Sequence, residues 1–524
     1  MSNFREEPDC RGGVESKKLD IIHFTMKKKF IIFKWIYPLI FLLVNLIFTN
    51  VSAQKGLTLE QALSVAESNS PTVLKTRLSL IRSQENLNAQ NAALKSKFAL
   101  SVNPITYSQN RAYNTSTSNF NTTKDLQSSG SFTVVQPVLA TDATVTLSDN
   151  FSYNNNLYNE QFKTAGVAYN NDLSIQLNQP LFTYNRTKLN LKTLQLQLEN
   201  AQLTYAVQLL ATEKSVTQSF YAVYQAQQSM DISNQAFQDM MKSYEITKNK
   251  ANAGISAQSE MFQAELNLET TRSDYENKQV AFENAKDAFK NQIGMSLYDD
   301  ILVIPNISVD TTVKIDVAFA IDQGLANRME LRERQITIES SLLDLVTVKA
   351  LNQFHGNLGL SFGYNGNDKN IQDIYSNPKN NENVALSFQI PIYDWGQEKS
   401  RIKAQEATIE SNKVDLGVQQ NDIILTIRQS YRNLKNLINQ IQIARQSVNN
   451  AQLTYDLNLE KYKNGDLTGM DLSIYQNQLS QNKLNYTNSL ISYKLELLNL
   501  KILTLYDFEN KQPVIPVKTL NNKN

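Results

Sequence analysis

Apolar residues recur at seven-residue intervals in two stretches of the chain that lie 211 positions apart. The later stretch carries Leu472, Leu479, Tyr486, Tyr493 and Leu500, and the earlier one carries Met261, Leu268, Tyr275, Phe282 and Phe289. Heptad spacing sustained over about four heptads indicates helices packed side by side. Gly465 follows Gly254, and Pro391 follows Pro180, at the same interval. We interpret the agreement as an internal duplication.

The helical period predicts three helices in each half. They cover residues 57–97, 186–250 and 257–292 in the first half, and 316–354, 397–462 and 467–506 in the second. Thr58 and Gln61 form a capping-box pattern at the start of the first predicted helix, and Pro71 predicts a break in that helix near Ser70. A helix of about 65 residues spans roughly 97 Å at 1.5 Å per residue, too long to fold into a compact globule.

The period drops to two in residues 98–185 and 356–393, which we predict to be strands. One apolar and one polar face suit a barrel wall between lipid and water, although a soluble sandwich alternates in the same way. The halves match at an interval of 258 positions before the strands and 211 after them, so the first half holds 47 extra residues, roughly 103–179. We expect an extra hairpin there, and the pattern leaves open whether it joins the wall.

Composition excludes several kinds of function. Lys plus Arg number 51 and Asp plus Glu 50, so no global charge attracts nucleic acid. Cys10 is the one cysteine, and His23 and His355 are the only histidines of the 524 residues. There is no phosphate-binding loop, histidine-based triad or metal-ligand cluster. We therefore expect no catalytic residue, no metal and no cofactor, and predict that the chain is not an enzyme.

The N-terminal region has the pattern of a secretory signal. Three lysines, Lys27 to Lys29, precede an apolar run over residues 30–48, and small residues follow to Ala53. We expect cleavage after Ala53, with an uncleaved anchor as the alternative, and residues 1–25 could precede the true start. The predicted parts are an N-terminal extension with the signal, a first repeat, a second repeat and a polar tail, over residues 1–53, 54–315, 316–506 and 507–524.

Four or six strands per chain are too few to close a pore, since a small barrel needs about eight. The strands must then be pooled between copies in a cyclic oligomer. A trimer gives twelve strands, or eighteen if the extra hairpin joins the wall. The predicted fold is mainly α, with a trimeric transmembrane β-barrel and a long coiled-coil tunnel.

Residues 57–506 resemble the TolC-like outer membrane efflux proteins. The resemblance rests on the order and spacing of several segments: Leu57-Thr-Leu-Glu-Gln-Ala-Leu, Gln179-Pro-Leu-Phe, Ile390-Pro-Ile-Tyr-Asp-Trp-Gly396, and Tyr462-Lys-Asn-Gly465 followed by Asp471-Leu472. It implies a homotrimer in outer membrane lipid whose helical tunnel crosses the periplasm. It also implies a passive exit duct for an inner-membrane pump, of the RND or ABC type, joined by a periplasmic adaptor. The alternative is a secreted or periplasmic coiled-coil scaffold or adhesin without a channel.

The resemblance also implies site residues. Asp471 and Glu260 match acidic positions at the closed periplasmic aperture, although both could be ordinary first-turn acids that complement a helix N-terminus. The family's second aperture acid is Ile474 here, and an expected basic residue is Leu467, so a different closing contact is expected.

Two further pairs of residues are candidates. Gly254 and Gly465 mark the helical-hairpin tips expected to meet the adaptor, and both also fit simple turn glycines. Tyr393 and Trp395, at a strand-to-helix junction, are predicted to belong to the periplasmic-side aromatic belt, with core packing as the alternative.

Overall fold

The computed structural model describes residues 55–116, 118–159, 164–309 and 313–514. The predicted signal and its cleavage after Ala53 lie outside these residues. The chain divides into two compact units, and the smaller comprises Met1–Leu57 with Leu297–Leu302. In it the short strand β1 (Lys55–Leu57) pairs with β6 (Ile301–Val303). All the other elements belong to the larger unit.

Eight helices of the larger unit repeat at the two predicted intervals. They are α2 (Leu59–Asn69), α3 (Pro71–Ala93), α4 (Arg186–Asn252), α5 (Gln258–Ile293), α6 (Val317–Asn327), α7 (Met329–Ala350), α8 (Gln397–Asn464) and α9 (Gly469–Thr504). Helix α6 begins and ends 258 positions after α2, and α9 begins and ends 211 positions after α5. The bounds of these helices therefore recur at the two intervals found in the sequence. No helix in the described ranges is both long and apolar enough to cross a membrane.

Local sequence fixes where the first helices start and stop. The Thr58 hydroxyl accepts from the Gln61 amide at 3.3 Å, while the Gln61 side chain accepts from the Thr58 amide at 3.0 Å. This is the predicted capping box, and it begins α2. Pro71 then occupies the start of α3, where its missing N–H costs nothing, so the chain breaks at Ser70 as predicted.

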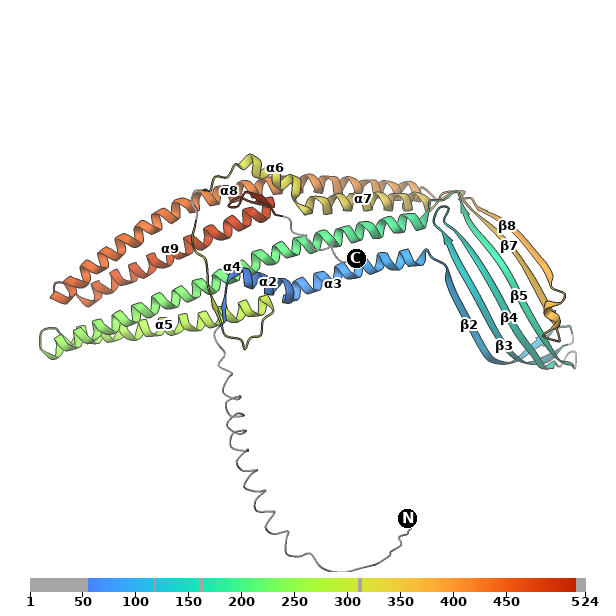
Figure 1. The fold of residues 1–524 in the computed structure, drawn as a ribbon, viewed down its shortest axis with the longest axis horizontal. Coiled ribbons are helices and arrows are strands. Elements are labelled where there is room, and N and C mark those ends of the chain that lie inside the picture. Colours follow the sequence, from blue (N-terminus) through green and yellow to red (C-terminus); the bar gives the residue numbers. More distant parts are fainter. Residues whose placement is uncertain (1–54, 117, 160–163, 310–312, 515–524) are drawn as a thin grey trace, which may run out of the picture. The chain divides into compact units, whose positions relative to one another are not determined.

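The strands of the larger unit form one antiparallel six-stranded sheet (Figure 1). In spatial order they are β2 (Lys97–Asn114), β3 (Asn119–Val138), β4 (Ala143–Asn159), β5 (Thr164–Leu181), β7 (His355–Asp368) and β8 (Lys379–Gln389). A short 3₁₀ turn, η1 (Asp373–Tyr375), lies between the last two. The first half supplies four strands and the second half two. The predicted extra hairpin is therefore part of the sheet itself.

The core lies along the helices. Residues of the second-half heptads, Leu472, Leu479, Tyr493 and Leu500, are buried, whereas Phe289 is the one heptad residue of α5 that is fully buried. At the start of the predicted polar tail, β9 (Tyr506–Asp507) pairs with β10 (Gln512–Pro513). Aromatic side chains cause this ordering: Tyr506 packs against Phe508, which is buried in the helical core.

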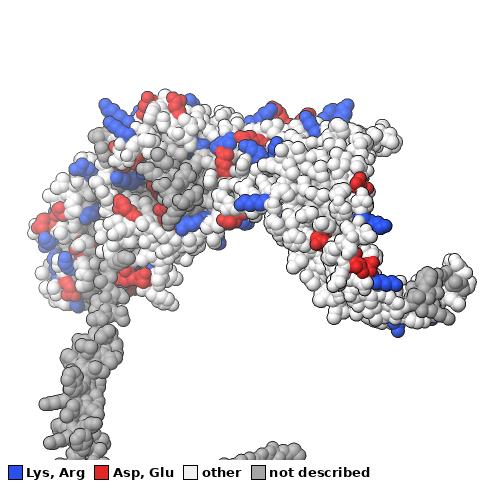
Figure 2. Space-filling view, turned by 45° about the vertical axis from the view of Figure 1, so that its right-hand side comes forward, with Lys and Arg blue, Asp and Glu red and all other residues white. Residues whose placement is uncertain are grey.

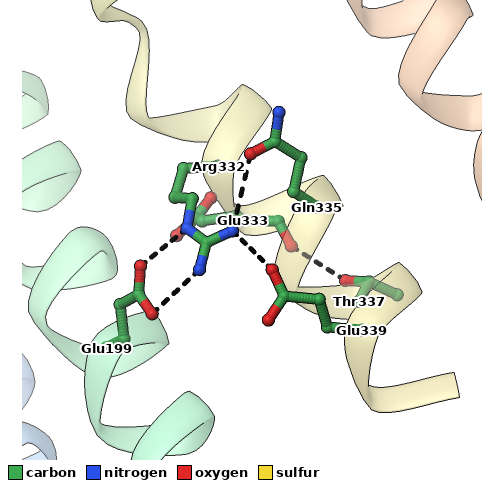
Figure 3. Close-up of polar contacts among 6 residues, drawn as sticks. All are labelled: Glu199, Arg332, Glu333, Gln335, Thr337 and Glu339. Carbon is green, nitrogen blue, oxygen red and sulfur yellow. Dashed lines mark hydrogen bonds and ion pairs between the residues drawn. The ribbon is translucent and has the colours of Figure 1, made fainter. Parts of the chain in front are cut away.

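An ion-pair cluster joins the two halves of the chain (Figure 3). Arg332 on α7 binds both carboxylate oxygens of Glu199 on α4, at 2.6 and 3.1 Å, and contacts Glu339 on its own helix at 2.6 Å. Hydrogen bonding to Arg332 lowers the pKa of Glu199. These side chains are 35 to 40% exposed, so solvent screens the attraction between their charges. The cluster therefore contributes little to stability and mainly orients α7 against α4.

Candidate functional site

The six-stranded sheet has one apolar and one polar face. Across its register, Phe98, Val134, Leu147, Ile175 and Phe362 stand opposite one another on β2, β3, β4, β5 and β7. The next row, on the other face, is Ala99, Thr133, Ser148, Ser174 and Gly363. The apolar side chains remain largely uncovered, with Phe98 69% exposed. A sheet of this kind can separate lipid from water.

Polar groups interrupt the apolar face at several positions, and on β8 Glu382 stands opposite Phe362. Asp149 and Asn171 fall there, and they satisfy each other through a hydrogen bond of 2.8 Å. Figure 2 shows charged side chains scattered over the helices, while the strand region at the right is nearly free of them except toward its lower end. Lys124, Asp125 and Asp368 lie at the strand ends away from the helices, while Asp149 and Glu382 lie within their strands.

Two left-handed glycines turn the helical hairpins. Gly254, between α4 and α5, has φ +75°, and Gly465, which ends α8, has φ +92°. A side chain would strain both backbones although the space around each Cβ position is open. The structure thus places both glycines at hairpin tips, as expected. Their contact with an adaptor stays a prediction.

The two predicted aperture acids line the same cavity, of about 690 Å³, between the hairpin tips. Glu260 is exposed in the first turn of α5. Asp471 is half-buried in the first turn of α9, where its amide donates to the Thr468 hydroxyl at 3.2 Å and its carboxylate accepts from that hydroxyl at 2.7 Å. The helix-capping alternative therefore holds for Asp471, and an aperture role beside it stays a prediction.

Tyr462 joins the two hairpins at this cavity, a role that the sequence did not reveal. Its phenol, on a side chain only 3% exposed, donates to the Ser243 carbonyl at 2.9 Å. It accepts from the Ser243 hydroxyl at 3.0 Å and lies 2.8 Å from the Thr247 hydroxyl. Lys250 adds a hydrogen bond of 3.2 Å to the Tyr462 carbonyl. The signal in the sequence was the pair of small hydroxyl residues four positions apart on α4.

A second tyrosine, Tyr455, lies seven residues before Tyr462 on α8 and supports the same junction between the two hairpins. Burial, together with the nearby carboxylates of Asp239 and Asp456, raises the pKa of Tyr455 to about 12. Its phenol therefore stays neutral well above physiological pH, near the carboxylate of Asp239. Tyr455 and Tyr462 belong to one buried cluster with Leu472 and Leu479. Helix α8 is thus joined to α4 by both apolar packing and hydroxyl groups.

Tyr393 and Trp395 lie in the segment that leads from β8 to α8. Their rings meet edge to face with centroids 4.8 Å apart, and they are 72 and 88% exposed. The core-packing alternative is therefore wrong within a single chain. Their place in an aromatic belt stays a prediction. Within the described ranges, no group of three or more His, Cys, Asp or Glu side chains could hold a metal ion.

Comparison with known proteins identifies the family of this chain. The family model described as outer membrane efflux protein matches residues 144–294 and 320–504. TolC of Escherichia coli is 28% identical over 118 residues, which are 22% of this chain and 24% of that protein. TolC of Salmonella enteritidis is 24% identical over 138 residues, which are 26 and 28% of the two chains. This chain thus spans about a quarter of the length of these curated relatives.

Solved structures agree on the fold. The CmeC outer membrane channel of Campylobacter jejuni has a TM-score of 0.64 at 13% identity, over 85% of each chain. The outer membrane protein VceC of Vibrio cholerae has a TM-score of 0.62 at 13% identity, over 85% of this chain and 96% of its own. Because the family model covers more than half of the residues, the chain belongs to the outer membrane efflux protein family, located in the outer membrane of Gram-negative cells with a periplasmic extension.

Proposed function

We propose that this chain forms, as a homotrimer, the outer membrane exit duct of a tripartite efflux or type I secretion system. The observation that carries the proposal is the six-stranded sheet with one apolar and one polar face, continued by two helical hairpins. The sheets of three copies close one barrel in the membrane. The polar face lines its water-filled interior and the apolar face meets lipid.

The helices continue the conduit into the periplasm. Helices α4 and α8 have 67 and 68 residues, which is about 100 Å each at 1.5 Å per residue. Three copies bring six of these long helices together around one tunnel, with the shorter α5 and α9 of each copy beside them. The duct is passive and does no chemistry. An inner-membrane pump, of the RND or ABC type, supplies the energy, and a periplasmic adaptor joins it to the duct.

The aperture lies at the hairpin tips. Three copies of Asp471 and Glu260 form rings of carboxylates that favour cations at the constriction. The contact of Tyr462 with α4 holds the hairpins of each copy together and takes the place of the closing contact that Leu467 and Ile474 do not provide. Gly254 and Gly465 keep the tips compact where the adaptor docks. Tyr393 and Trp395 stand at the periplasmic side of the membrane.

Conductance tests this proposal directly. The full chain is purified from outer membranes in mild detergent, its mass is measured by light scattering, and it is inserted into planar bilayers. The duct predicts a trimer and discrete conductance steps. A monomer without conductance would favour the scaffold alternative.

Docking is tested by the variants Gly254→Val and Gly465→Val, which should lose export in an antibiotic-susceptibility assay and keep the trimer. Export at the normal level would show that the tips do not meet the adaptor.

A further inference from the structure

The sheet has two edges that no strand covers in the described chain, β2 and β8. Apolar side chains gather at both edges. Phe98, Leu100 and Val102 on β2 are more than 60% exposed, and just beyond the end of β8, Ile390 is 66% and Ile392 94% exposed. An open edge of this length and composition is a template for another strand. Natural proteins normally cover or blunt such an edge.

The duplication supplies a template for what covers these edges. Strand β5, the last of the first half, pairs with β7, the first of the second half. Strand β2 begins 258 positions before β7, at Lys97 and His355. Helix α8 begins 211 positions after α4, and at that interval β5 corresponds to residues 375–392, which contain β8. The junction between β5 and β7 inside one chain therefore corresponds to a junction of β8 with a β2 from another copy.

We propose that β8 of one copy pairs antiparallel with β2 of the next, in the register of the β5–β7 junction. Each pair within one chain has an equivalent pair between two copies. The equivalents of Leu177–Leu360, Gln179–Leu358 and Leu181–Gly356 are Phe388–Val102, Ile390–Leu100 and Ile392–Phe98, respectively. The proposal rests on the shared barrel of the proposed function. It adds the edges, the register and the number of strands.

The register matches the faces of the sheet. All three pairs place two apolar side chains on the face that carries Phe362, while Gln389 meets Ser101 on the polar face. A slip of one residue would set Phe388, Ile390 and Ile392 against Lys97, Ala99, Ser101 or Asn103, which belong to the opposite face of β2. The register follows from the pairing of β5 with β7 and from the two repeat intervals.

The register also explains where β8 stops. On β5, pairing with β4 ends at Asn178, and residues 179–181 stay in the strand because β7 pairs with them. On β8, pairing with β7 ends at Gln389, which is the counterpart of Asn178. Residues 390–392 have no partner strand in the described chain and leave the sheet there. The edge of the next copy supplies that partner and extends β8 to Ile392.

The number of strands in the barrel follows from this closure. The hairpin β3–β4 lies between β2 and β5, in the interior of the sheet of each copy. Because the copies pair through the outer strands β2 and β8, all six strands of each copy belong to the barrel wall. Three copies make eighteen strands. At about 4.8 Å between strands and a tilt of about 40°, the barrel is about 36 Å across, against about 24 Å for twelve strands.

Cysteine cross-linking tests the register in the full chain, with Cys10 replaced by serine. Gln389→Cys and Ser101→Cys are combined, since both side chains are exposed and the pair corresponds to Asn178–Gly359 within one chain. The matched control combines Gln389→Cys with Asn103→Cys, which is two residues out of register on the same strand. After oxidation in isolated outer membranes, a non-reducing gel should show covalent dimers and trimers for the first pair, at least tenfold more than for the control.

The outcomes separate this inference from the duct itself. Equal or stronger cross-linking of the control pair, in a chain that light scattering shows to be a trimer, overturns the register and leaves the duct standing. A monomer overturns both. Cryo-electron microscopy of the unsubstituted protein gives an independent count: eighteen strands are expected, and a wall of twelve with β3–β4 outside it overturns the proposal.

Discussion

Replacing Tyr462 with phenylalanine removes a single oxygen from the junction between the hairpins and keeps the ring. That oxygen makes three contacts of 2.8 to 3.0 Å with Ser243 and Thr247 on α4, in a site with almost no access to water. After the change the Thr247 hydroxyl keeps its bond to the Ser243 carbonyl at 3.0 Å. The Ser243 hydroxyl loses its acceptor.

The expected cost follows from these contacts. A net hydrogen bond contributes about 0.5–1.5 kcal/mol, and a buried polar group left unpaired costs about 1–3 kcal/mol. A loss of about 2 kcal/mol is a shift of roughly 30-fold in an equilibrium between joined and separated hairpins. The apolar cluster around the ring remains, so the chain should fold and assemble normally.

Planar-bilayer recording and susceptibility to a large antibiotic measure the effect. The Tyr462→Phe duct should spend more time in a high-conductance state and admit the antibiotic. Tyr475→Phe is the matched control, because Tyr475 packs against the same cluster and its hydroxyl makes no hydrogen bond within the described residues. Conductance equal to that of the control would show that the junction does not hold the aperture closed.

Three other changes have defined outcomes. Arg332→Gln should lower the free energy of unfolding by only about 1 kcal/mol, because its ion pairs are well exposed, and a loss several times larger in thermal denaturation would contradict that estimate. The amides of Glu398 and Gly396 donate to Asp394 and lower its pKa, so its stabilisation is present at neutral pH and lost as pH falls below the ordinary value of 3.8 through the lowered pKa. Asp394→Asn should therefore reduce the melting temperature at pH 7 and have no effect in strong acid, and an equal reduction at both pH values would refute this. Asp471→Ala should enlarge the aperture and weaken cation preference, and unchanged conductance and ion selectivity would restrict Asp471 to helix capping.

Much of the fold could be predicted because its signals are local. The capping box at Thr58 and the break before Pro71 depend on neighbouring residues alone, and both occur where expected. The repeat intervals locate the helices of one half from those of the other. The pairing of β9 with β10 in the predicted tail was not foreseen, because Phe508 packs against core residues that are distant in sequence.

The candidate site was harder to predict. Nothing near Tyr462 in sequence points to Ser243, more than 200 positions earlier, and only the packing of α8 against α4 brings them together. The sequence places Asp471 in the first turn of a helix, as the structure does. It does not reveal whether the carboxylate binds Thr468, as it does in the structure, or lines an aperture. The sequence also left open whether the extra hairpin joins the sheet, because alternation looks the same in either arrangement.

The position of that hairpin has a consequence for how such proteins change in evolution. An insertion between β2 and β5 adds two strands at a time and leaves the direction and residues of both outer strands as they were. A single added strand would reverse one of them and break the match between neighbours. In the proposed barrel, bore size therefore changes by whole hairpins, with no compensating mutation where the copies meet.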